Sequence, residues 1–185
     1  KRLPKAYGAD PLRDIQVITP LRERTSLSCE SLNTLFQERL NPVPLPAGSR
    51  FKVGDKVIQT KNRYDLDLVN GDMGTVLDVS LKARSLVVDF GNTMKPMELP
   101  LHDNNLDLAY AITCHKFQGS EARIVVIPIH RAFGPLILQR NWLYTAVSRA
   151  REVCVLVGHR DEIPRIIARN QQQRRHTRLA KLLTA

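Results

Sequence analysis

Residues 123–129 read Arg-Ile-Val-Val-Ile-Pro-Ile, a β-branched run that is typical of a strand in the middle of a sheet. A polar segment at 113–121 precedes this run, and a stretch of helical composition follows at 141–150. A second apolar run at 153–158 predicts another buried strand. Alternating strands and helices favour an α/β domain with a parallel sheet and helices on both faces.

The first fifty residues extend this pattern. Residues 1–14 show no clear period and are predicted to be a loop, whereas 15–19 predict a short buried strand. A helix is expected to begin after a capping Ser28 and to end before Pro42. Its buried face is expected to carry Leu32, Leu35, Phe36 and Leu40.

Between residues 50 and 100 the pattern changes to short strands separated by turns. Strands are predicted at 73–79, 85–90 and 94–99, with a two-residue hairpin turn at Gly91-Asn92. Four or more antiparallel strands in about fifty residues predict a small β-barrel. The predicted organisation is therefore an α/β domain formed by 1–48 and 104–185, interrupted by an insert at 50–100.

The chain is strongly basic, with a formal net charge of +10 over 185 residues. Such an excess indicates a polyanionic partner, nucleic acid first, although a basic solubilising surface is the alternative. The segment 165–185 holds six Lys or Arg residues and no acid, which favours the first interpretation.

Other features exclude several classes of protein. Three cysteines, at 29, 114 and 154, lack metal-binding spacing, so no metal site is expected. No apolar run is long enough to span a bilayer, and no signal segment opens the chain. These observations predict a soluble, cytoplasmic protein.

The segment 144–151 reads Tyr-Thr-Ala-Val-Ser-Arg-Ala-Arg. It resembles motif VI of the RecD-like branch of superfamily 1 helicases, in which Thr is common at the position of Ser148. That resemblance implies that Arg149 is the catalytic arginine finger, which contacts the γ-phosphate of ATP. If both arginines lay on one helix, Arg149 and Arg151 would point about 200° apart.

The segment 113–121 reads Thr-Cys-His-Lys-Phe-Gln-Gly-Ser-Glu. Thr113 is expected to cap a helix, and Gly119 to permit close approach or a positive φ. The segment resembles motif V of the same helicases. The resemblance implies DNA-backbone contacts for Thr113 and His115, and nucleotide-binding positions for Gln118, Gly119 and Glu121, with Arg149 completing the nucleotide site.

The insert also fits the family. Segments 53–62 and 69–74 resemble the SH3-like insert of RecD-like helicases, which helps to hold single-stranded DNA. A basic and aromatic group here could grip phosphate and stack a base, or form a solvated hairpin loop. It consists of Lys61, Asn62, Arg63 and Tyr64.

A third region of resemblance lies near the amino terminus, at 16–22. Thr19 and Arg22 follow a strand, where open α/β sheets bind ligands. Thr19 is a candidate contact for a DNA phosphate. For Arg22, a surface ion pair is the favoured interpretation.

The loop that cradles the ATP phosphates and the acidic pair that holds magnesium are missing from this sequence. The 185 residues contain no GxxxxGK[ST] loop and no acidic pair of the magnesium-holding kind. The resemblance therefore predicts the C-terminal part of an ATP-dependent 5′-to-3′ DNA helicase, inactive by itself. ATP and Mg²⁺ would be bound mainly by a first motor domain of the same protein, and single-stranded DNA would cross both domains. The alternatives are a non-enzymatic nucleic-acid-binding module and the helicase part of a conjugative relaxase.

Overall fold

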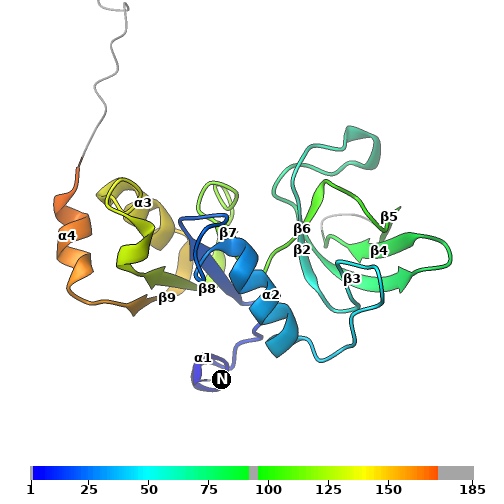
Figure 1. Cartoon of the computed structure of the whole chain (residues 1–185), viewed down its shortest axis with the longest axis horizontal. Coiled ribbons are helices and arrows are strands. Elements are labelled where there is room, and N and C mark those ends of the chain that lie inside the picture. Colours follow the sequence, from blue (N-terminus) through cyan, green and yellow to red (C-terminus); the bar gives the residue numbers. More distant parts are fainter. Residues whose placement is uncertain (1, 92–95, 171–185) are drawn as a thin grey trace, which may run out of the picture.

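The computed structural model describes residues 2–91 and 96–170. Its strands form two sheets, one toward each end of the long axis of the molecule (Figure 1). One is parallel and the other is antiparallel, so the predicted combination of an α/β part and an all-β part is confirmed.

The parallel sheet has the strand order β7-β1-β8-β9. Its strands are β1 (Ile15–Thr19), β7 (Ala111–Thr113), β8 (Ala122–Ile129) and β9 (Ala150–Gly158). The β-branched run at 123–129 lies in β8, an interior strand between β1 and β9, as its composition predicts. β9 pairs with β8 alone among the described residues, and much of it is exposed, so the prediction of a fully buried strand at 153–158 is wrong.

Helices pack against this sheet, and a hydrophobic core lies between the helices and the strands. Side chains of β1 and β8 pack with those of α3 (Arg140–Val147) and α4 (Glu162–Ala168), and include Ile18, Ile127, Leu143 and Ile166. A short 3-10 helix, η2 (Arg131–Phe133), adds Phe133 to the same core. The loop predicted for 1–14 contains a short helix, α1 (Arg2–Tyr7). None of the described helices has the length and apolarity to cross a membrane.

The predicted helix near residue 30 is present as α2 (Cys29–Leu40), but its buried face differs from the prediction. Leu32 is buried as predicted, but Leu35 and Leu40 are each 42% exposed, and Asn33 and Gln37 are buried instead. Asn33 exchanges hydrogen bonds with the backbone of Ala111, so this helix face serves the backbone of β7 as well as the apolar core. Ser28 occupies the N-cap position without a capping side-chain bond.

The antiparallel sheet has the order β5-β4-β3-β2-β6. Its strands are β2 (Lys56–Gln59), β3 (Met73–Ser80), β4 (Ser85–Asp89), β5 (Met97–Pro100) and β6 (Leu106–Leu108), with the 3-10 helix η1 (Tyr64–Leu66) between β2 and β3. The described residues show no pairing between the end strands β5 and β6, so a closed barrel is not present there. The predicted turn at Gly91-Asn92 lies partly outside the described residues, and the predicted insert boundaries stay a prediction.

A buried carboxylate joins the two sheets. Asp55, which is 0% exposed, accepts hydrogen bonds from Gln37 and Asn41 of the α2 region and from the hydroxyl of Tyr110, which precedes β7. The backbone N–H of Lys52 donates a further bond of 2.9 Å. Burial, and then the bond to Asp55, raise the pKa of Tyr110, so its hydroxyl stays a donor. A carboxylate with so many donors fixes α2, the insert and β7 in one arrangement.

Candidate nucleotide and nucleic-acid interface

Arg149 lies in a turn and not on a helix. Helix α3 ends at Val147, and Ala150 already begins β9, so the helix predicted through residue 150 is wrong at its end. The reason is strand pairing, because Ala150 lies opposite Ala122 of β8. Arg151 is therefore a strand residue, and the expected 200° helical separation from Arg149 does not apply.

Among the described residues, the guanidinium of Arg149 forms its hydrogen bonds with neutral oxygens. Its Nε donates to the carbonyl of Thr145 (3.2 Å), and its Nη atoms donate to the Ser148 hydroxyl (3.1 Å) and the Ser120 carbonyl (3.5 Å). Across residues 2–91 and 96–170 it forms no ion pair. Three hydrogen bonds thus orient the side chain, and no carboxylate of the described residues neutralises its positive charge.

The segment 113–121 forms consecutive turns and not the predicted capped helix. Thr113 lies level with Thr19 of β1, whereas Ile124 lies level with Ile15. The eight residues between β7 and β8 must therefore return along the sheet by roughly 20 Å. A helix of eight residues spans only about 12 Å, so it could not make this connection.

Local contacts hold these turns in place. The hydroxyl of Thr113 accepts from the N–H of Lys116 (3.4 Å), and Phe117 is buried in the core. Gly119 adopts a φ of +89°, as the sequence predicts for this position. Between these fixed points, His115 and Gln118 are exposed.

The two polar motifs are neighbours in space. Cys114, His115 and Gln118 line one side of a cavity of about 230 Å³, and Asn141, Trp142 and Thr145 line the other. The Trp142 indole N–H is buried there without a partner among the described residues. A backbone bond from Ala122 N–H to Arg149 carbonyl (3.0 Å) adds a second connection. The exposed Glu121 lies beside Ala122, at the same edge of the sheet.

The residues predicted to contact DNA differ in accessibility. Thr19 is 0% exposed, and its hydroxyl donates to the Leu27 carbonyl at 2.6 Å. Its predicted contact with DNA would require a rearrangement. Thr113 is half-buried at the end of β7, and His115 is exposed. Arg22 pairs with Glu30 at 3.4 Å, which confirms the surface ion pair favoured for it.

Three of the four residues in the predicted basic and aromatic group of the insert have exposed side chains. Lys61 and Asn62 are exposed, and Tyr64 is 80% exposed. Asn62 donates to the Tyr64 hydroxyl at 2.6 Å and accepts from the backbone of Asn70, which orients the ring. Arg63, in contrast, pairs with Asp65 and with the buried Asp103, so its charge is neutralised locally.

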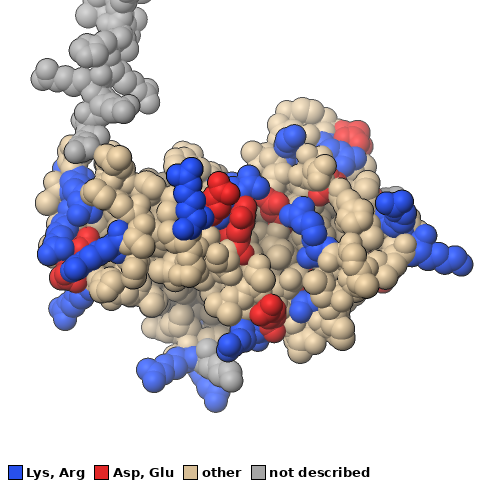
Figure 2. Space-filling view, viewed as in Figure 1, with Lys and Arg blue, Asp and Glu red and all other residues tan. Residues whose placement is uncertain are grey.

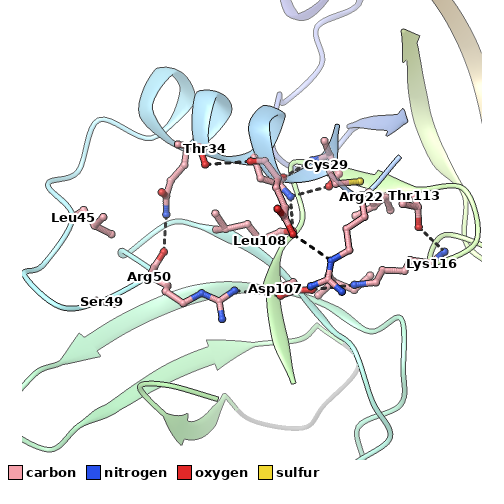
Figure 3. A pocket seen from close by; sticks show the side chains of 16 residues that line it. Arg22, Cys29, Thr34, Leu45, Ser49, Arg50, Asp107, Leu108, Thr113 and Lys116 are labelled. Carbon is pink, nitrogen blue, oxygen red and sulfur yellow. Dashed lines mark hydrogen bonds and ion pairs between the residues drawn. The ribbon is translucent and has the colours of Figure 1, made fainter. Parts of the chain in front are cut away.

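A larger cavity of about 470 Å³ lies where the two sheets meet. Its wall includes Thr113 together with Arg22, Arg50 and Lys116, whose side chains point toward Asp107 (Figure 3). Sequence reasoning did not identify Arg50 or Asp107, because each is a single charge beside a strand and the sequence carries no signal that they converge.

Charged groups of both signs meet at this junction. In Figure 2, acidic and basic side chains stand next to one another across the middle of the molecule. Within the described residues, the basic excess predicted from composition is therefore interrupted by carboxylates between the two sheets.

Comparison with known proteins identifies both parts of the chain. The family described as UvrD-like helicase C-terminal domain matches residues 108–157, which include both polar motifs. The family described as ATP-dependent RecD-like DNA helicase SH3 domain matches residues 32–90, which include β2, β3 and β4.

Individual relatives agree with these matches. The ATP-dependent RecD2 DNA helicase of Deinococcus radiodurans is 37% identical over 176 residues, which cover 92% of this chain and 24% of that protein. The RecBCD enzyme subunit RecD of Mycolicibacterium smegmatis is 34% identical over 138 residues, with 75% and 24% covered. The chain thus spans about a quarter of the length of these curated relatives.

Structural comparison gives the same fold. The crystal structure of the Bacteroides Pif1 helicase in complex with ADP-AlF3 and ssDNA superimposes with a TM-score of 0.59. Its sequence is 20% identical, and the match covers 82% of this chain and 42% of that one. The parallel sheet is accordingly RecA-like. The chain belongs to the RecD-like branch of superfamily 1 helicases, and it contains the helicase C-terminal domain and the SH3 domain of that family.

Proposed function

We propose that this chain serves as the second motor domain of an ATP-dependent DNA helicase, and that Arg149 acts on ATP held by a first motor domain of the same protein. The observation that carries this proposal is the state of the Arg149 guanidinium, which neutral oxygens orient and no carboxylate of the described residues neutralises. A guanidinium in that state can stabilise negative charge on another molecule.

The proposed chemistry is phosphoryl transfer from ATP to water. Charge spreads over the γ-phosphate oxygens in the transition state, and a positioned guanidinium lowers the barrier by stabilising that charge. Mg²⁺ and the phosphate-binding loop would belong to the first domain. In this domain, Gln118, Gly119 and Glu121 are sequence neighbours of Ser120 and Ala122, which both form hydrogen bonds with Arg149.

We propose that single-stranded DNA passes over Thr113 and His115 and under the insert. Lys61, Asn62 and Tyr64 supply a charge, an amide and an exposed ring, which together suit a phosphate and a stacked base. The motif V turns then link DNA to Arg149, because they begin at Thr113 and end at the Ser120 carbonyl. Closing and opening of the two motor domains would move the strand in the 5′-to-3′ direction.

The direction is tested by unwinding partial duplexes with the full-length protein that carries these residues. We expect ATP-dependent separation of a duplex with a 5′ single-stranded overhang, and little separation of the same duplex with a 3′ overhang. Omitting Mg²⁺ is the control for the ATP requirement. Equal activity on both overhangs would overturn the polarity, and DNA binding without any unwinding would support a non-enzymatic module.

A further inference from the structure

The cavity between the two sheets holds an ion-pair arrangement that the proposed DNA path does not yet use. Asp107 lies on β6 of the antiparallel sheet, Lys116 in the motif V turns and Arg50 in the segment that leads to β2 of that sheet. Figure 3 shows the three side chains converging from these separate segments. Because three separate segments form this cavity wall, contacts between the antiparallel and the parallel sheet can change there.

The Asp107 carboxylate binds one cation with each of its oxygens. Oδ1 is 3.3 Å from an Arg50 nitrogen, and Oδ2 is 3.0 Å from Lys116 Nζ. Burial by itself raises the pKa of Asp107, but the hydrogen bonds from Lys116 and Arg50 and the charges of Lys116 and Arg22 outweigh it, and the net pKa is lowered. The group is therefore an anion at neutral pH, held between two cations as a bridging phosphate would be.

Another anion can reach these two cations from solvent. The side chains of Arg50, Lys116 and Asp107 are 55%, 31% and 25% exposed, so the ion pairs are open to solvent and are screened. A phosphate offers the same oxygen acceptors to Arg and Lys. Thr113, the proposed DNA-backbone contact, lines the same cavity.

We propose that Asp107 is a built-in competitor of DNA, whose carboxylate occupies the place between Arg50 and Lys116 that a phosphate of the bound strand takes. This inference rests on the proposed function, because it needs a single strand at Thr113. In the absence of DNA, the ion pair between Asp107 and Lys116 connects the antiparallel sheet to the motif V turns. When a phosphate enters, it takes over both cations, and Asp107 sets how tightly the strand is held.

The test is binding of a fluorescently labelled oligothymidylate to this chain, measured by anisotropy over a series of salt concentrations. Asp107→Asn keeps the shape of the side chain and removes its charge. We expect it to raise affinity about three- to tenfold at low salt, and to steepen the slope of log K against log salt by about 0.7, the value of one phosphate contact to a single strand. Glu98→Gln, which removes an exposed acid of β5, is the matched control for net charge.

The outcomes separate this inference from the function on which it rests. In the Asp107→Asn background, Lys116→Ala should cancel the gain, because the released cation is what the phosphate uses. Unchanged or weaker binding by Asp107→Asn, with normal binding by the parent chain, would overturn the competitor role and leave Asp107 as a brace. A gain equal to that of Glu98→Gln would also overturn it. Absence of binding by the parent chain at low salt would instead count against the proposed function.

Discussion

At the scale of single residues, chemistry was easier to predict from the sequence than accessibility. The motif around Arg149 identified that residue by its neighbours, and the structure places it beside Ser120 of the other motif. Thr19 has equally suitable chemistry, but its hydroxyl is used by the Leu27 carbonyl. Nothing in the local sequence distinguishes a hydroxyl that faces solvent from one that is satisfied internally, because the partner lies eight residues away along a loop.

Lys56 provides a test of burial at the junction of the sheets. Its Nζ donates to Gln16 Oε1 at 2.9 Å, across from β2 to β1, and burial lowers its pKa to about 8. Above that pH the folded protein loses a proton that the unfolded chain keeps up to about 10.5. Unfolding then takes up a proton, so the free energy of unfolding rises with pH in this window.

The prediction for Lys56 is a difference in slope. Between pH 8 and 9, the free energy of unfolding should rise by about 1 kcal/mol more in the parent chain than in Lys56→Met. Burial raises the pKa of Cys29 to about 12, which gives the opposite trend as the pH rises, but this contribution is the same in both chains and cancels in the difference. Urea titrations would measure it, with the exposed Lys82→Met as control. Parallel pH profiles for the parent chain and Lys56→Met would contradict the lowered pKa of Lys56.

At the scale of elements, strands were predicted better than helix ends and helix faces. Each predicted strand of the parallel sheet is present, because β-branched runs bounded by Pro, Gly or polar residues leave few other conformations. The helix expected after Thr113 is absent, because the connection from β7 to β8 must run back along the sheet further than a helix of its length would span. That distance depends on the order of the strands in the sheet. The face of α2 was predicted from its leucines, but Asn33 and Gln37 are turned inward by acceptors that lie far along the chain.

The hydrogen bonds of Asp55 should contribute strongly to stability, because they connect α2, the insert and the segment before β7. Asp55→Ala leaves the buried donors of Gln37, Asn41 and Tyr110 without their acceptor. We expect the free energy of unfolding to fall by about 3–5 kcal/mol, the range for removing one partner of a buried charged cluster. Chemical denaturation followed by tryptophan fluorescence would measure this, since Trp142 is the single tryptophan.

Asp78→Ala is the matched control for Asp55, because Asp78 is an exposed acid on β3. Its effect should stay within about 0.5 kcal/mol, as for most surface substitutions. A loss below about 1 kcal/mol for Asp55→Ala would mean that the two sheets are held together mainly by their apolar contacts, and that the carboxylate is dispensable.

At the scale of the whole molecule, one segment connects the two proposed binding surfaces. Residues 113–122 begin at the cavity between the sheets and end at the carbonyl and amide contacts of Arg149. Composition predicted a basic, nucleic-acid-binding protein, and motif resemblance predicted the family. Neither could predict that Asp107 of β6 would pair with Arg50 and Lys116 at the junction, because that depends on how the two sheets are packed.

The central claim is that Arg149 supplies positive charge to ATP bound by another domain, and one measurement tests it most directly. DNA-stimulated ATP hydrolysis should be measured for the full-length protein that carries these residues, with Arg149→Ala compared to Arg151→Ala, an exposed arginine two residues away. We expect the rate to fall roughly 10³- to 10⁵-fold for Arg149→Ala, with nucleotide and DNA binding retained, and to stay near normal for Arg151→Ala. A near-normal rate for Arg149→Ala would contradict it.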